Sequence, residues 1–518
     1  MRLEVAFVAL FSVATAVALL ARWVKIPYTI ALVVAGLILG TVHAFQPPHL
    51  TKELLFAVFL PGLVFEAAFH LDFHRFWQNK FTINALAVPG VIASLTLTTV
   101  LFFPAASALH FLDGLRIEHA LVFAALIAAT DPIAVVALFK SMHAPKRLTM
   151  LIESESLLND GTAVVFFTIA LSHANGESVS IGGAALDFCK IVGMGALIGT
   201  CIGLGVSRLL QRVADPMIEI TLTTLAAYGS FVTAEQFHFS GIIATVAAGM
   251  VCGNYAGRAG MSPSSQIAVE TFWEYISFAL NSIVFLLIGF EVRIESLLQS
   301  WSVILMAYLA VTISRAGVVY LVTLLLRRSS ERLPWSWSMI LTWGGLRGGL
   351  SMVLVLGLAP DFPFRAQLIT ITFGVVLLSI LIQGLTTAPL MRWLGITGTQ
   401  ADRSHYESAR LRVRTKNAAL DELDQMLKAG LVHADAVQPL REEYATALAA
   451  AEQAVRELHL QTAELQQEEL HAAQRQLLLI EKGVALESLR KGIISQAALE
   501  HLLADIDARL FKLDNSSD

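Results

Sequence analysis

The stretch LIESESLLNDGTAVVFF, residues 151–167, sets six polar side chains directly before an uncharged apolar run. On an α-helix, residues four apart differ by about 40° around the axis, so Ser156 and Asp160 share one face. A hydroxyl and a carboxylate are oxygen ligands suited to a hard monovalent cation, and the carboxylate can also take up a proton. Glu155 and Asn159 share the adjacent face, so the two faces can carry out different tasks.

The two deepest carboxylates of this stretch are expected to differ in charge state. A buried carboxylate without a positive partner favours its neutral form. A carboxylate paired with an arginine, which is always charged, stays ionised and serves the structure. Arg347 is the deepest candidate for such a partner, and we predict that it pairs with Glu155. This leaves Asp160 as the working carboxylate.

Ionisable residues inside a membrane segment are costly, so each of them is a functional hypothesis by default. Asp131 follows fourteen residues of an apolar segment, 117–130, and precedes IAVVALF, so it does not lie at a helix end. Glu153, in contrast, is predicted to lie near water. His70 and His74 have a spacing that can bind metal, but an interfacial position at a helix end is the favoured interpretation.

These side chains require elements that cross a bilayer, and the composition supplies them. The 518 residues are 56% hydrophobic and only 15% charged, with a mean hydropathy of +0.66, which is typical of a membrane protein. Segments of the length that spans a bilayer occur at 4–24, 27–45, 53–70, 84–108, 117–139, 149–172, 186–210, 216–234, 239–254, 268–290, 299–326, 336–358 and 367–394. We therefore predict an all-α polytopic membrane protein with about thirteen transmembrane helices.

The loop charges predict the orientation. One side carries Arg22, Lys25, Arg75, Lys80, Lys146, Arg147, Arg208, Arg212, Arg258, Arg327, Arg328, Arg332 and Arg392. The other side carries Arg2, Lys52, Arg116, Arg293 and Arg365. Because positive loops stay in the cytoplasm, we expect the N-terminus outside and the C-terminal tail inside. The net charge of −5 gives no indication of nucleic-acid binding.

Glycine and proline interrupt three of the predicted spans, in ATDPIAVVA (129–137), SGIIATVAAG (240–249) and GGLRGGLSM (344–352). Pro132 removes a backbone donor, and the glycine pairs loosen the helix around Arg347. Such breaks are tolerated in lipid where the freed backbone groups are buried in protein or line a cavity. Discontinuous helices of this kind hold ions in secondary transporters.

A domain boundary is expected near residue 400. Residues 401–518 contain 14 Lys/Arg and 20 Asp/Glu, whereas the much longer stretch 1–400 contains 22 and 21. We assign 1–398 to a transmembrane domain and 399–518 to a cytoplasmic helical domain. Its predicted helix over 435–482 ends near Gly483, a second piece covers 484–492, and Ser495 could cap a last helix. The tail is either a dimer contact or a regulatory lid.

Several motifs together resemble those of the bacterial NhaP/NHE-type monovalent cation–proton exchangers, the sodium–proton antiporters. They are ATDPIAVVALF, ESESLLNDGTAVVFF, SGIIATVAAGM, FWEYISFALNSIVFLLIGFE and GGLRGG, and LPGLVFEAAFHLDF (60–73) resembles that family's third-helix motif. They occur in the family's order over about residues 5–395. No single motif is specific, but the set is.

The resemblance implies a Na⁺ site at which Asp160 binds cation and proton in turn. The remaining implied ligands are Asp131, the main-chain carbonyl of Thr130, the Ser156 side chain and, through water, Glu66. It also implies that Glu155 and Arg347 form the family's structural ion pair, and that Asn159 holds two broken helices together.

The resemblance further implies inverted repeats, crossed discontinuous helices, a dimerisation part beside an ion-transporting core, and a homodimer in the bacterial cell membrane. The expected activity is electroneutral Na⁺(Li⁺)/H⁺ exchange by alternating access, without a cofactor and without enzymatic chemistry. A K⁺/H⁺ exchanger of the same architecture is the close alternative, because no residue of the site measures cation size. A cation channel, a membrane sensor or scaffold, and a membrane enzyme are less favoured.

Overall fold

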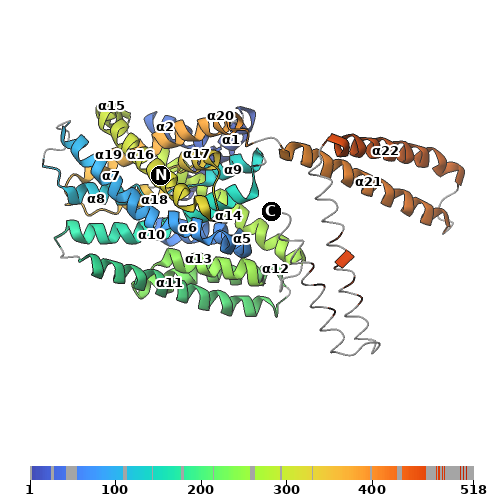
Figure 1. Ribbon diagram of the computed structural model, residues 1–518, viewed down its shortest axis with the longest axis horizontal. Coiled ribbons are helices and arrows are strands. Elements are labelled where there is room, and N and C mark those ends of the chain that lie inside the picture. Colours follow the sequence, from blue (N-terminus) through green and yellow to red (C-terminus); the bar gives the residue numbers. More distant parts are fainter. Residues whose placement is uncertain are drawn as a thin grey trace. The chain divides into compact units, whose positions relative to one another are not determined.

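The structure is a computed structural model that describes residues 3–24, 28–42, 55–108, 114–142, 144–176, 180–213, 215–256, 263–291, 294–329, 331–396, 399–428 and 434–461, with single positions beyond 461 (Figure 1). The chain divides into two compact units, Met1–Ile396 and Thr397–Asp518. Within the described ranges the secondary structure is entirely helical.

The first half of the larger unit contains α1 (Leu3–Val24), α2 (Tyr28–Thr41), the π-helical turn η1 (Leu55–Phe59), α4 (Leu60–His70), α5 (Phe73–Gln78), α6 (Lys80–Ala87), α7 (Pro89–Ala108), α8 (Ile117–Leu126), α9 (Ile133–Ser141), α10 (Lys146–Ala174) and α11 (Ile181–Leu210). The second half contains α12 (Pro216–Gln236), α13 (Gly241–Val251), η2 (Cys252–Ala256), α14 (Pro263–Glu291), α15 (Ile294–Gln299), α16 (Trp301–Leu325), η3 (Leu326–Arg328), α17 (Trp335–Trp343), α18 (Gly349–Leu356), α19 (Arg365–Leu378), η4 (Ser379–Gln383) and α20 (Gly384–Trp393).

The predicted fold class is confirmed. Every predicted span coincides with one helix or with consecutive helices. In the described part of the chain, seven helices are long and apolar enough to cross a membrane, and five shorter apolar helices accompany them. Large apolar side chains such as Trp23, Leu186 and Leu225 are exposed on the helix surfaces, as expected where the surrounding solvent is lipid. The chain is a multi-pass membrane protein.

The helices of the larger unit pack as two groups. One, called here the α14 group, joins α1, α2, α4 and α11–α14, and the other, the α10 group, joins α5–α10 and α15–α20. The backbones of α2 and α14 touch, since a methyl group on Gly289 would lie 2.8 Å from the Cα atom of Gly36. Only glycine allows two helices to come this close.

Two of the three predicted breaks are confirmed, both in the α10 group, and the third is wrong, because α13 runs as a continuous helix over Gly241–Val251. The first separates α8 from α9 at 127–132, and the second separates α17 from α18 at 344–348. The two breaks meet, because the Asp131 amide donates to the Leu346 carbonyl at 2.7 Å. The Arg347 amide donates to the Ser379 hydroxyl at 3.1 Å. The freed backbone groups are thus hydrogen-bonded inside the protein, so a break in the helix is tolerated at membrane depth.

The smaller unit contains α21 (Thr399–Lys428) and α22 (Ala434–Gln461), which pack against each other. The Lys416 ammonium lies 4.2 Å from the Tyr444 ring centre, and Arg441 forms an ion pair with Asp424 at 3.3 Å. The helix predicted from residue 435 is confirmed as far as Gln461. Of the other predictions, the helix end near Gly483, most of the piece 484–492, the Ser495 cap, and the loop charges Arg2, Lys25, Lys52, Arg258 and Arg293 lie outside the described residues.

Candidate ion-binding site

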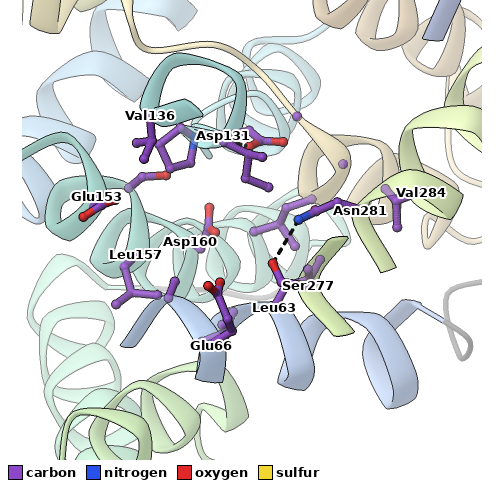
Figure 2. Close-up of a pocket in the computed structure, with 18 of the residues that line it drawn as sticks. Leu63, Glu66, Asp131, Val136, Glu153, Leu157, Asp160, Ser277, Asn281 and Val284 are labelled. Atoms are coloured by element: carbon purple, nitrogen blue, oxygen red, sulfur yellow. Dashed lines mark hydrogen bonds between the residues drawn. The ribbon is translucent and has the colours of Figure 1, made fainter. Parts of the chain in front are cut away.

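A cavity of about 400 Å³ lies between the two helix groups. Its walls come from α4 and α14 on one side, and from α10, the α8–α9 break and the start of α18 on the other. Figure 2 shows the Asp160 side chain reaching into this space, between Asp131 from the break and Glu66 from α4. The structure therefore brings together three carboxylates that lie far apart in the sequence.

Asp160 is the carboxylate best placed to bind a cation or a proton. It stands one turn after Ser156 on α10, and both line the cavity, as their shared helical face predicts. Its Oδ1 atom is buried and has no hydrogen-bond partner among the described residues. A buried oxygen in this condition needs a ligand, because leaving it unmatched costs free energy. A cation or a proton satisfies that need.

Three further residues that offer oxygen atoms, Thr130, Asp131 and Ser156, line the cavity with Asp160. The Ser156 hydroxyl donates a hydrogen bond to the Thr130 carbonyl, so the two oxygens expected to bind the ion are adjacent. Asp131 accepts from the Ile133 amide at 3.0 Å through Oδ1. This contact places the Asp131 carboxylate at the start of α9, beside the cavity. The geometry suits a hard cation that prefers oxygen.

Asn159 lies behind the site. Its side chain is buried, and its Nδ2 atom donates to the Ala128 carbonyl and to the Thr130 hydroxyl, both at 3.1 Å. These bonds hold the α8–α9 break against α10. The structure thus shows Asn159 bonded to one of the two broken helices, α8–α9, that the resemblance has it hold together.

The ion pair expected between Glu155 and Arg347 is wrong. Arg315, on α16, binds Glu155 instead, with Nη1 at 2.8 Å from Oε1 and Nη2 at 2.7 Å from Oε2. Both side chains are almost fully buried. The planar guanidinium matches the two carboxylate oxygens, which makes this a bidentate pair of the strong kind.

Arg347 has a different task, which explains the error. Its Nη1 atom donates to the Ala128 carbonyl at 2.7 Å and to the Ala129 carbonyl at 3.3 Å. Carbonyls at the end of a helix lack intrahelical donors, and those after α8 are buried. Arg347 therefore donates hydrogen bonds to the backbone carbonyls at the helix break and does not pair with the Glu155 carboxylate.

Arg315 was missed from the sequence, although a signal was present. It stands in the middle of the apolar span 299–326, within VTISRAGVV, and is therefore an intramembrane cation like Arg347. The sequence offers two deep arginines for one locked carboxylate. Helical periodicity on α10 does not say which distant helix lies opposite Glu155.

Further charged side chains line the cavity. Glu153, predicted to lie near water, is one of them, and it stands two turns inside α10. Glu274 from α14, Lys140 from α9 and His70 from α4 complete the set. Together with Glu66, Asp131 and Asp160, the carboxylates outnumber the basic groups. An acidic, low-dielectric cleft of this kind raises the local concentration of cations.

Gly348 offers a direct test of the site's geometry. A Cβ atom at this position would lie 2.7 Å from Cγ of Asp131, so Gly348→Ala must displace that carboxylate. We expect the variant to weaken Na⁺ binding by roughly tenfold or more, measured by calorimetric titration of the purified protein. Gly193→Ala on α11 is the control, because no described atom outside the neighbouring backbone of its own helix lies within 4 Å of the added methyl group. Wild-type affinity in Gly348→Ala would contradict the placement of Asp131 at the ion.

Comparison with known proteins identifies relatives along nearly the whole chain. The family model "Sodium/hydrogen exchanger, transmembrane" matches residues 8–393. The Na⁺/H⁺ antiporter NhaG of Bacillus atrophaeus is 34% identical over 523 residues, covering 97% of this chain and 96% of its own length. The low-affinity Na⁺/H⁺ antiporter NhaS1 of Synechocystis sp. is 37% identical over 432 residues, covering 81% of this chain and 80% of its own.

A solved structure shares the fold. The sodium proton antiporter MjNhaP1 of Methanocaldococcus jannaschii superposes with a TM-score of 0.63 at 17% sequence identity, covering 76% of this chain and 99% of that one. Because the family model spans most of the chain, and relatives above 30% identity cover it almost from end to end, the chain belongs to the sodium/hydrogen exchanger family.

Proposed function

We propose that this protein is a secondary active antiporter that exchanges Na⁺ or Li⁺ for H⁺, with both ions competing for Asp160. The observation that carries the proposal is the unpartnered Asp160 oxygen in the cavity. The names of the relatives support Na⁺ as the cation. Deprotonated Asp160 binds the cation, with Asp131, Ser156 and the Thr130 carbonyl as further ligands, and protonation displaces it.

Alternating access follows from the two helix groups. Asp160, Ser156 and Asp131 all belong to the α10 group, while Glu66 belongs to the α14 group. We expect the α10 group to carry the ion past the α14 group, so that Glu66 contacts it through water in only part of the cycle. No cofactor is needed, because the proton gradient supplies the free energy.

The charge count supports electroneutral exchange. Glu155 is neutralised by Arg315, and position 159 is an uncharged asparagine. Of the two carboxylates proposed as direct ligands, Asp131 accepts a backbone hydrogen bond from Ile133, and we take Asp160 as the one that exchanges one cation for one proton. Moving one charge through 100 mV is worth about 2.3 kcal/mol, but a one-for-one exchange moves no net charge. The voltage therefore neither drives nor opposes it.

The proposed topology places the N-terminus outside and the C-terminal unit in the cytoplasm of a bacterial cell. On this topology the cavity reaches the cytoplasmic side, because His70 ends α4 and Lys140 stands one residue before the end of α9. The structure then corresponds to an inward-open state. We further propose a homodimer and a regulatory role for the C-terminal unit.

The test uses the purified full chain in proteoliposomes that contain a pH-sensitive dye. Adding Na⁺ or Li⁺ outside is expected to move protons outward from the vesicle, and the rate is expected to stay the same when K⁺ and valinomycin clamp the voltage. A response to K⁺ alone would identify a K⁺/H⁺ exchanger instead. A current that scales with the Na⁺ gradient would refute electroneutral exchange, and absence of any cation-driven proton movement would refute the proposed function.

A further inference from the structure

A second cavity, of about 10 Å³, lies inside the α10 group. Its walls come from α16, from the α17–α18 break and from η4, the π-helical turn that follows α19. One water molecule needs about this much space, roughly 10–15 Å³. The cavity is therefore too small for an organic molecule or a hydrated ion, but it has room for one water.

Three polar atoms on residues that line this cavity have no partner with hydrogen-bond geometry among the described residues. They are the Tyr308 hydroxyl and Arg315 Nε, both on α16, and Gln383 Oε1 on η4. The three residues are only 5%, 7% and 3% exposed, respectively. Leaving a buried polar atom unmatched costs free energy, so three of them around one cavity indicate a ligand that they share.

The chemical types of the three atoms identify this ligand. The Arg315 Nε–H group only donates, the Gln383 Oε1 atom only accepts, and the Tyr308 hydroxyl can do either. A metal cation accepts no hydrogen bond and is repelled by the guanidinium, whereas a halide anion has no proton to donate to Oε1. Water both donates and accepts, and a buried water typically makes about three hydrogen bonds.

The backbone around the cavity suits a ligand of this size. A Cβ atom on Gly345, in the α17–α18 break, would lie 3.0 Å from Arg315 Nε, so glycine leaves that nitrogen uncovered. Both end residues of the π-helical turn, Ser379 and Gln383, are buried and line the cavity. The Ser379 hydroxyl already accepts from the Arg347 amide, which leaves Gln383 for the ligand. Turns of this kind are rare and occur mostly at functional sites.

We propose that this cavity binds one water molecule, which accepts a hydrogen bond from Arg315 Nε, donates one to Gln383 Oε1 and shares one with the Tyr308 hydroxyl. Arg315 already bonds Glu155 through Nη1 and Nη2, and its Nη2 atom also donates to the Leu341 carbonyl at 3.2 Å. The water satisfies the Nε–H group and so fixes the plane of the guanidinium that faces Glu155. Tyr308 and Gln383 are thus positioning residues for the ion pair, a task that goes beyond the proposed function and does not depend on it.

The direct test is hydroxyl-radical footprinting of the purified full chain with synchrotron X-rays, read by mass spectrometry. X-rays activate bound waters in place, so an aromatic ring beside a bound water is hydroxylated although bulk solvent does not reach it. We expect strong labelling of Tyr308 and none of Phe123, which is fully buried among apolar side chains. In Gln383→Leu, which lacks the acceptor, the Tyr308 label is expected to fall to the level of Phe123. Labelling of wild-type Tyr308 no higher than that of Phe123 would overturn the inference.

Thermal stability gives a second test, in which the sign of the effect depends on the water. With the water bound, Tyr308→Phe and Gln383→Leu each break one of its hydrogen bonds, so we expect each to lower the melting temperature by roughly 2–4 °C. Without a water, each substitution removes a buried polar atom that has no partner, and the melting temperature would stay equal or rise. Tyr320→Phe on the same helix is the control, because Tyr320 does not line the cavity.

The double variant tests whether the two residues share one ligand. In Tyr308→Phe/Gln383→Leu, the fall in melting temperature is expected to be smaller than the sum of the two single falls, because both substitutions act on the same water. Additive falls, or an unchanged or higher melting temperature in both single variants, would overturn the inference. The footprint of the wild-type chain decides the question even if a variant does not fold.

Discussion

Asp160→Asn is expected to reduce Na⁺-driven proton movement to the level of empty liposomes. The amide has the shape of the carboxylate, but it can neither ionise nor exchange a proton at neutral pH. Glu155 is locked by Arg315, and the remaining carboxylate of α10, Glu153, stands two helical turns before Asp160, so we expect neither to take over its task. Calorimetric titration with Na⁺ is expected to show no binding to the variant.

The fold of Asp160→Asn is expected to survive, which makes the loss of transport interpretable. Removing a buried charge that lacks a hydrogen-bond partner at Oδ1 relieves a desolvation cost, so the melting temperature should stay equal or rise. Asp361→Asn is the control, because Asp361 is exposed between α18 and α19. Retained cation-driven proton movement in Asp160→Asn would rule out competition at a single carboxylate.

Arg315→Ala is expected to be the most destabilising single change in the α10 group. It leaves the Glu155 carboxylate buried without its bidentate partner, and breaking a buried pair in this way costs about 3–5 kcal/mol. A strong fall in the yield of monodisperse protein and in the melting temperature should follow. Arg315→Lys keeps the charge but loses the planar fork, so it should be intermediate.

Two comparisons make the Arg315 prediction specific. Arg347→Ala leaves the Glu155–Arg315 pair intact and should cost less, because it removes hydrogen bonds to two carbonyls rather than the partner of a buried charge. Arg212→Ala, which truncates an exposed side chain after α11, should have almost no effect. If Arg347→Ala proves more destabilising than Arg315→Ala, the Glu155–Arg315 pair is not the main stabilising contact.

The fold was predictable because membrane spans are local signals. About 20 apolar residues are recognisable without knowing their neighbours, and Pro132 and the glycines around Arg347 mark the two breaks within the spans. The helical period also ordered the faces of α10 correctly, since Ser156 and Asp160 line the cavity while Glu155 points elsewhere. Each of these features depends on one segment of the chain only.

Partnership across helices was not predictable in the same way. Glu155 and Arg315 are 160 residues apart, and the spacing on either helix gives an angle about its own axis but not the identity of the helix opposite.

The contact of Gly36 with Gly289 has a mechanical consequence. Two backbones in direct contact cannot slide past one another without a steric collision. We therefore expect α2 and α14 to move as one rigid unit. Any sliding must then occur where side chains meet, and around the cavity these include Leu63, Val136, Leu157 and Val284. Aliphatic side chains form no hydrogen bonds across an interface, so the two helix groups could slide past each other there without breaking any. In the proposed mechanism, this glycine contact places α2 and α14 in the part that stays in place while the α10 group moves.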